Sequence, residues 1–465
     1  MNLTSPSEEG ASFARLKPTT RELRELLGLA LPVAAVQVGM MLMGVVDTIM
    51  VGHFSARDLA AVALGNLYFF SAVVFPMGLL MALDPVVSQA IGAGDRPAVG
   101  RAFQRGGILA LALSLPAGAA LLPGTSLLTF LRQPPEVVPV AAGYALASIP
   151  GIIPFLAFIV LRQTLQAMGR VAPIVVVIVL ANLANLFFNW VLIFGNLGFP
   201  RMGAVGSGWA SSLSRWLMLL GLLTLSWPLL RGYVRPLRPE SLQLRPLGRM
   251  IRLGAPIGIQ FGLEFGAFGT IGVLMGWLGT VAMAGHQVAM NLSSLTFMVP
   301  LGISQATAVR VGQGVGREDP SGARRAAGAG LLLGVGFMTL TAVLFLLAPE
   351  LFALIYSDEP EVVALAALLV PLAGVFQVFD GLQVVSSGVL RGVGDTRFPM
   401  IMNLLGFWCV GIPVSLWLGF RTSAGPVGLW WGLVAGLASV AVLLLLRIRS
   451  RMGGDLKRIV IEDEE

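Results

Sequence analysis

The sequence predicts an all-α polytopic membrane protein with twelve transmembrane helices in two six-helix lobes. Three observations support this fold class. The chain of 465 residues is 56% apolar and only 12% charged, with a mean hydropathy of +0.84, which is outside the range of soluble domains. Twelve apolar segments are long enough to cross a bilayer, and the two halves of the chain resemble each other.

The predicted spans follow one another with short loops. A spanning helix needs about 20 mostly apolar residues. The apolar run after the polar N-terminal segment is too long for a signal-peptide core, so we expect a first span rather than a cleaved leader. The expected spans are 25–51, 60–91, 101–122, 137–162, 171–195, 203–230, 248–277, 281–312, 323–349, 361–390, 398–420 and 425–446.

The positions of basic residues predict the orientation in the membrane. Most arginine and lysine residues fall in the loops on the side that carries both termini, and the opposite loops contain only Arg57, Arg132, Arg201 and Arg421. Because basic loops stay in the cytoplasm, we expect both termini to be cytoplasmic. The basic excess therefore indicates orientation and not nucleic-acid binding.

Two repeated motifs indicate an internal duplication. FPMGLLMALDPVVSQAIGAGD from Phe75 resembles VPLGISQATAVRVGQGVGRED from Val299, and LQAMGRVAP from Leu165 resembles LRGVGDTRFP from Leu390. The offset is 224 or 225 residues in both places. A duplicated block of six spans keeps its orientation, which implies two lobes related by an axis along the membrane normal, as in alternating-access carriers.

The duplication predicts the domain organisation. A cytoplasmic N-terminal segment covers residues 1–24 and an N-lobe covers 25–230. A polar, basic cytoplasmic linker at 231–247 leads to a C-lobe at 248–446 and a cytoplasmic tail at 447–465.

Few charged side chains fall inside the spans, and each is a candidate for function because a charge in the membrane is costly. The candidates are Asp47, Asp84, Arg215, Glu264 and Asp380. Asp84 precedes Pro85 near the cytoplasmic end of its span, where capping is the better explanation. Arg215 is better explained by pairing with an acid or by snorkelling. For the other acids, the structural alternative is a buried hydrogen-bonded staple.

Asp47 is expected to meet polar side chains of the fifth and sixth spans. Asn185, Asn189 and Ser211 reach the same depth when each helix is counted inward from its end. Asn182 shares a stripe with the other two asparagines, and such a stripe must face protein or water. Simple hydrogen bonding between helices also explains the stripe. Carboxylate and amide oxygens suit Na⁺, so Asp47, Asn185 and Asn189 are a candidate Na⁺ site, and the carboxylate could instead take a proton.

Two further polar residues occur early in the eighth span. His286 and Gln287 are expected either to line a cavity or to bridge helices.

The sequence contains no common catalytic motif. No Walker A sequence, GxSxG elbow or metalloprotease motif is present, and Cys409 is the single cysteine. We therefore expect neither an enzyme nor a bound cofactor, and transport would draw its energy from an ion gradient.

Several motifs resemble the multidrug and toxic compound extrusion (MATE) family, in particular its bacterial NorM-like branch. They are VDTIMVGHFSARDLAAVALG at 46–65, AGHQVAMNLSSLTFMVPLGIS at 284–304 and VRVGQGVGRE at 309–318, with GLEFGAFG at 262–269 and LQAMGR at 165–170. The resemblance covers essentially all twelve spans. It implies an antiporter of the bacterial inner membrane that exports small organic cations, such as dyes and fluoroquinolones, in exchange for Na⁺ or H⁺. No oligomerisation signal is present, so a functional monomer is expected.

The resemblance also implies roles for residues of the first half. Asp47 matches the functional acid of the first helix, and Asn185 and Asn189 match paired polar positions of the fifth helix. Ser211 stands where relatives often have threonine.

In the second half, Glu264 and Asp380 match acids that are implicated in cation coupling in NorM-like proteins. Phe376, one turn before Asp380, is a departure, because Na⁺-coupled relatives have tyrosine there. The missing oxygen puts Na⁺ binding in the second lobe in doubt. Phe376 is also a candidate for lining the cavity.

Three alternative functions stay open. A flippase for a lipid-linked or amphipathic substrate has the same two-lobe plan, but a cavity for phosphate should be strongly basic, and the charge here is mainly acidic. A membrane enzyme would need a nucleophile or metal set, and a receptor would show no substrate flux.

Overall fold

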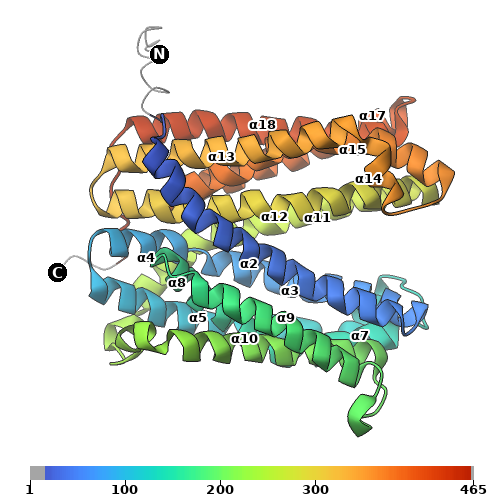
Figure 1. Ribbon diagram of the computed structural model, residues 1–465, viewed down its shortest axis with the longest axis horizontal. Helices are drawn as coiled ribbons and strands as arrows, with labels where there is room; N and C mark the ends of the chain where they lie inside the picture. The colour runs from blue at the N-terminus through green and yellow to red at the C-terminus, as the bar shows by residue number, and fades with distance from the viewer. Residues whose placement is uncertain (1–15, 462–465) are drawn as a thin grey trace. The chain divides into compact units, whose positions relative to one another are not determined.

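A computed structural model describes residues 16–461 of the protein (Figure 1), and every regular element in that range is a helix. The predicted all-α fold is therefore confirmed for these residues. The expected cytoplasmic segments 1–24 and 447–465 lie partly outside the described residues, at 1–15 and 462–465.

The chain forms two compact units. Unit 1 contains the described residues up to Ala34, then Ser88–Gly94 and Ile259–Val460. Unit 2 contains Ala35–Val87, Asp95–Gly258 and residue Ile461.

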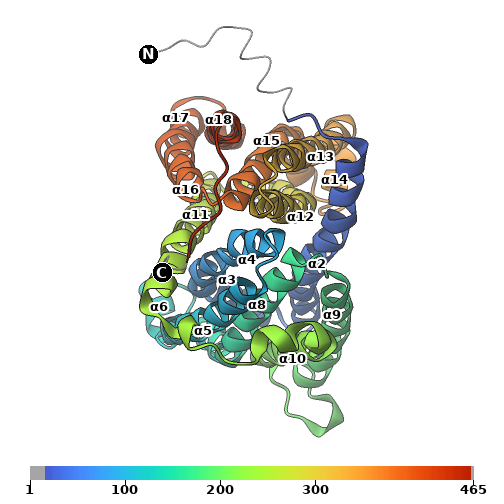
Figure 2. The ribbon, with the colours of Figure 1, turned by 90° about the vertical axis from the view of Figure 1, so that its left-hand side faces the viewer.

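Unit 2 is built around the long helix α10, which packs against α7, α8 and α9, while α3 packs against α5 and α7. Figure 2 shows α9 and α10 side by side within this unit. Its elements are α3 (Ala56–Leu80), α5 (Arg96–Leu121), α6 (Gly124–Phe130), α7 (Val138–Ser148), η1 (Ile149–Gly151), α8 (Ile152–Ala167), α9 (Ala172–Leu192), η2 (Asn196–Gly198), α10 (Gly203–Val234) and η3 (Pro239–Leu242).

Unit 1 is built around α15, which packs against α12, α13 and α18. The π-helix η4 and α17 pack against α18. The elements are α12 (Thr280–Gly316), α13 (Pro320–Leu347), α14 (Pro349–Leu354), α15 (Pro360–Gly392), α16 (Arg397–Asn403), η4 (Leu404–Gly411), α17 (Ile412–Arg421) and α18 (Gly425–Gly453). Most of α4 (Leu83–Gly92) also belongs to this unit.

Two helices are shared by the units. In α2 (Thr20–Gly52) the division falls after Ala34, and in α11 (Leu244–Trp277) it falls after Gly258. Both the helix starts and the division points are repeat partners at an offset of 224 residues. The duplication read from the sequence is thus present in the helix pattern.

The duplication extends to turn geometry. Asp95 and Asp319 occupy equivalent positions and are the N-caps of α5 and α13, where each carboxylate accepts a hydrogen bond from the backbone N–H three residues later. The preceding residues, Gly94 and Glu318, both have left-handed backbone angles, with φ of 71° and 55°. Glu318 therefore adopts a conformation that usually requires glycine.

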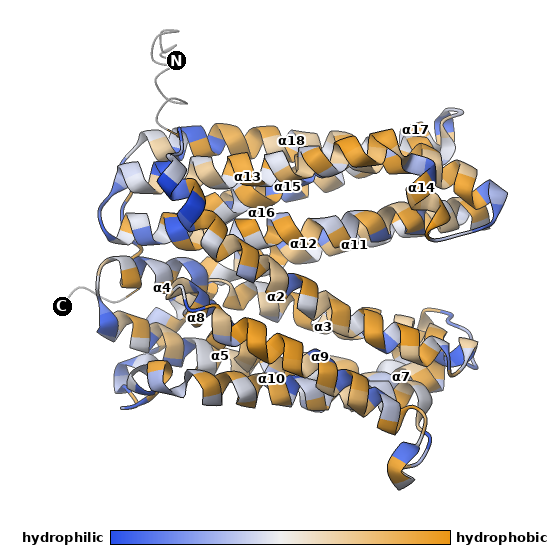
Figure 3. Ribbon diagram, in the orientation of Figure 1, coloured by the Kyte–Doolittle hydropathy of each residue, from blue (hydrophilic) through white to orange (hydrophobic). Residues whose placement is uncertain are grey.

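The helices have the length and composition of membrane spans. Among the described residues, eleven helices are long and apolar enough to cross a membrane, and the pair α5 and α6, bent by 55°, makes a twelfth if it counts as one span. Figure 3 shows hydrophobic residues along the helices and hydrophilic residues gathered towards their ends. Large apolar side chains such as Leu115, Leu183 and Leu340 are exposed, as a lipid environment requires.

Helices α3 and α11 approach closely within unit 2. A Cβ atom added to Gly254 would lie 2.2 Å from the backbone oxygen of Leu79, and one added to Gly258 would lie 2.6 Å from that of Phe75. Backbone contacts of this kind require glycine, which is common where helices pack in membranes.

We predict that Gly254→Ala separates α3 from α11 and lowers the melting temperature in detergent by several degrees, since overpacking costs about 1–3 kcal/mol. Gly248→Ala is the matched control on the same helix, because a Cβ atom there meets no other atom within 4 Å. The control should melt at or above the wild-type temperature, since alanine favours helix. Equal melting of the two variants would contradict the close packing.

Candidate functional site

Asp47 lies in the part of α2 that belongs to unit 2, and it is only 4% exposed. Its Oδ1 accepts hydrogen bonds from Asn185 Nδ2 at 3.0 Å and from Asn189 Nδ2 at 2.6 Å. Its Oδ2 accepts one from Ser211 Oγ at 2.5 Å. The spacing of four residues places both asparagines on the same face of α9, so one helix supplies two donors. The structure thus brings together all four residues that were expected to meet.

The two asparagines are also bonded to each other. Asn189 Nδ2 donates to Asn185 Oδ1 at 3.1 Å, while Asn189 Oδ1 is buried without a hydrogen-bond partner within residues 16–461. An unpaired amide oxygen beside a carboxylate is a ready ligand for a hard cation or a proton donor.

Asn182 has a different role from its neighbours on the stripe. Its Nδ2 donates to the backbone oxygens of Gly39 and Ile178, both at 2.9 Å. Asn182 therefore ties α9 to α2, and its printed bonds do not include Asp47.

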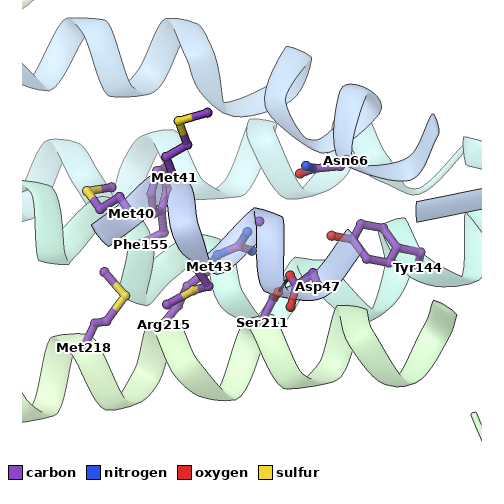
Figure 4. Close-up of a pocket in the computed structure, with 11 residues that line it drawn as sticks. Met40, Met41, Met43, Asp47, Asn66, Tyr144, Phe155, Ser211, Arg215 and Met218 are labelled. Carbon is purple, nitrogen blue, oxygen red and sulfur yellow. Dashed lines mark hydrogen bonds between the residues drawn. The ribbon is translucent and has the colours of Figure 1, made fainter. Parts of the chain in front are cut away.

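A pocket of about 240 Å³ adjoins Asp47 within unit 2 (Figure 4). Figure 4 shows Ser211 beside the Asp47 carboxylate, with Arg215 and Phe155 on the same side. Methionines supply much of the wall, and a flexible thioether surface adapts to ligands of varied shape. The lining residues are Met40, Met41, Met43, Gly44, Asp47, Asn66, Tyr144, Phe155, Ser211, Arg215 and Met218.

Arg215 shares this pocket with Asp47 and attracts it electrostatically. Its guanidinium carbon lies 4.0 Å from the ring centroid of Phe69 and 5.6 Å from that of Phe155, so two aromatic faces hold the cation. Its Nη1 is buried and has no hydrogen-bond partner among the described residues. The sequence suggested pairing with an acid or snorkelling for this residue and missed the aromatic contacts.

A second acidic cluster lies in unit 1. Glu264 Oε1 accepts hydrogen bonds from Gln260 Nε2 at 3.0 Å and from Gln383 Nε2 at 2.8 Å. Asp380 is 9% exposed and interacts electrostatically with Glu264. The two acids thus lie close enough to repel each other when both are charged, and this repulsion favours binding of a cation or a proton.

The sequence stage missed the glutamines of this cluster. Gln383 also donates to Asn403 Oδ1 at 3.2 Å, directly before the π-helix η4, and π-turns are frequent at functional sites. Spacing was an available signal, because Gln260 precedes Glu264 by four residues and Gln383 follows Asp380 by three.

Phe376 and His286 belong to an aromatic cluster in unit 1. Phe376 packs edge-to-face against Phe268 at 6.0 Å and Trp430 at 5.8 Å, and His286 packs against Trp430 at 5.7 Å. Both Phe376 and His286 are buried, whereas the neighbouring Gln287 is exposed and donates to Asn291 Oδ1 at 3.1 Å on its own helix. These adjacent residues of α12 therefore face different surroundings.

The ligand chemistry of the two acidic clusters is that of hard cations. Among residues 16–461, no group of three or more His, Cys, Asp or Glu side chains is arranged to hold a metal ion. The available ligands are instead single carboxylates with neighbouring amide and hydroxyl groups, which suit a weakly held ion that is released again.

The helices and the buried acids define a multi-pass membrane protein of the transporter class. The MatE family profile matches residues 32–191 and 256–417. The chain belongs to the MatE family, the MATE multidrug efflux transporters.

Relatives and solved structures agree with this assignment. Multidrug resistance protein NorM of Photobacterium profundum is 35% identical over 437 residues, covering 92% of this chain and 95% of the relative. Multidrug resistance protein PmpM of Pseudomonas aeruginosa is 38% identical, covering 92% and 91%. The crystal structure of the eukaryotic MATE transporter AtDTX14 superposes with a TM-score of 0.84 at 25% identity, covering 92% of this chain and 95% of that one.

We predict that Asp47→Asn preserves the stability of unit 2, because an amide oxygen still accepts from the asparagines and Ser211 can turn its hydroxyl to accept. Asp47→Leu strands these donors, at about 1–3 kcal/mol for each buried group. The Asp47→Leu variant should therefore melt several degrees lower in detergent than Asp47→Asn. Similar melting temperatures for the two variants would show that the donors find other partners.

Proposed function

We propose that the protein is a secondary active multidrug efflux antiporter, which exports organic cations in exchange for Na⁺ or H⁺ by alternating access. The observation that carries this proposal is the buried Asp47 carboxylate, with its amide and hydroxyl partners, at the wall of a pocket rich in methionine. The pocket offers one site of negative charge and an adaptable apolar surface to a cationic drug. Membership of the MatE family supports the same function.

The proposed coupling rests on competition for Asp47. A ligand shifts a conformational equilibrium only through different affinity for the two states. Binding of Na⁺ or H⁺ at Asp47, helped by Asn185 and Asn189, would remove the charge that attracts the drug. Release of that cation on the other side of the membrane would restore it.

Glu264 and Asp380 are proposed to supply a second cation-responsive site. Their electrostatic interaction makes the pair receptive to positive charge. Phe376 contributes a ring and no oxygen, which favours a proton over Na⁺ at this site. His286, Gln287 and Asn182 are proposed only as secondary contributors to the transport path.

The architecture that we propose for transport has an N-lobe at 25–230, a linker at 231–247 and a C-lobe at 248–446. The protein would lie in the bacterial inner membrane with both termini cytoplasmic and would act as a monomer. The basic loops and the internal duplication support this arrangement.

The first test is transport in proteoliposomes. We expect a Na⁺ gradient or a pH gradient, imposed separately, to drive ethidium movement in the wild type. Asp47→Asn should lower the gradient-driven rate by at least about tenfold, since it removes the charge on which exchange depends. Asp358→Asn, at an exposed loop position, is the matched control.

The outcome of this test separates the candidate functions. Full transport by Asp47→Asn would move the coupling role to Glu264 and Asp380. No movement of any organic cation under either gradient would overturn the drug-efflux proposal in favour of a flippase or a receptor.

A second test concerns the acids of unit 1. We predict that Glu264→Gln and Asp380→Asn each raise the concentration of the driving cation needed for half-maximal transport by about tenfold, because each removes a charge that binds it. Titration of the initial ethidium rate against that cation measures the change. Glu350→Gln, an exposed acid of α14, is the control, and a shift no larger than in this control would limit coupling to Asp47.

A further inference from the structure

The pocket in unit 2 contains both signs of charge. Asp47 and Arg215 both line it, and Arg215 follows Ser211 by four residues on α10, so the two side chains share one face of that helix. A pocket that selected simple cations would be expected to have no fixed positive charge. Arg215 therefore needs an explanation beyond cation efflux.

Arg215 has no acid as a hydrogen-bonding partner in the part of the chain that the structure describes. Its guanidinium lies against the faces of Phe69 and Phe155, and its Nη1 is buried without a partner. The carboxylate of Asp47 accepts its three hydrogen bonds from neutral groups. The acid and the guanidinium are each available to a ligand, and neither neutralises the other by direct hydrogen bonding.

An unsatisfied guanidinium N–H is costly in an apolar environment, so ligand binding is a physical reason to retain it. Guanidinium groups recognise carboxylates through charge-assisted hydrogen bonds, and the two rings restrict where this group can point. The aromatic ring of Phe155 and the methionines line the same pocket and suit a flat hydrophobic body.

We propose that this pocket recognises zwitterionic aromatic compounds, with the cationic end of the ligand near Asp47 and its carboxylate at Arg215 Nη1. Arg215 is then the residue that determines specificity for zwitterions over simple cations. This inference rests on the proposed transport function and names a substrate class for the same site.

The test uses a pair of dyes that differ in one group. Rhodamine 110 carries a free carboxylate, and rhodamine 123 is its methyl ester, which is cationic only. Transport of both dyes is measured in proteoliposomes for the wild type, Arg215→Gln, Arg215→Lys and Arg231→Gln. Arg231 is exposed in the last turn of α10 and gives the same change of charge on the same helix.

We expect Arg215→Gln to lower the ratio of kcat/KM for rhodamine 110 to that for rhodamine 123 by about tenfold, the loss of one charged contact. Arg215→Lys should keep most of the ratio, and Arg231→Gln should keep all of it. If Arg215 only holds helices together, transport of both dyes falls in parallel and the ratio stays constant, which would overturn the inference.

Binding to the purified wild type provides a second measurement that no variant's folding can confound. Fluorescence polarisation should show rhodamine 110 binding at least as tightly as rhodamine 123, and tenfold weaker binding would overturn the inference. Ethidium transport without rhodamine 110 transport would overturn it while leaving the efflux function intact. Failure of the wild type to move any of the three dyes would overturn the efflux function and the inference together.

Discussion

A carboxylate buried among apolar helices must find its hydrogen-bond donors within the protein, because lipid offers none. Asp47 obtains three donors, two from α9 and one from α10. This requirement fixes the register of α2 against both helices, since a shift of one residue would carry the donors away. It also links structure to transport, because a cation that reaches Asp47 must compete with the interactions that hold these helices together.

The other end of α2 is held by a different interaction. Arg310 of α12 donates to both oxygens of Glu22 at 3.0 Å and to Glu25 at 2.6 Å, all within unit 1. Three charged groups that satisfy one another form a more rigid contact than a single surface pair. Helix α2 is therefore anchored by ion pairs in the segment that belongs to unit 1, and it presents Asp47 in the segment that belongs to unit 2.

Sequence reasoning succeeded where one coordinate was enough. The depth of Asp47, Asn185 and Ser211 follows from counting residues along straight helices, so their meeting was predictable. The contact of Glu264 with Gln383 depends on how α15 is rotated about its own axis, and counting along the helix does not contain that angle. Arg162 shows the same limit. It was counted among cytoplasmic loop residues, but it is buried in α8 and donates to Gln37 at 2.9 Å.

The duplication explains where the acids lie without explaining why they differ. Both shared helices carry one, Asp47 on α2 and Glu264 on α11, yet these are not repeat partners. The partner of Asp47 is Ile271, which is fully buried in the apolar core of unit 1, and the partner of Glu264 is Met40, which lines the Asp47 pocket. The inherited feature is therefore a pair of helices that each cross from one unit to the other. Each copy then acquired its acid at its own depth, with donors drawn from the helices of its own unit, so the two acidic sites can differ in ion preference while sharing one scaffold.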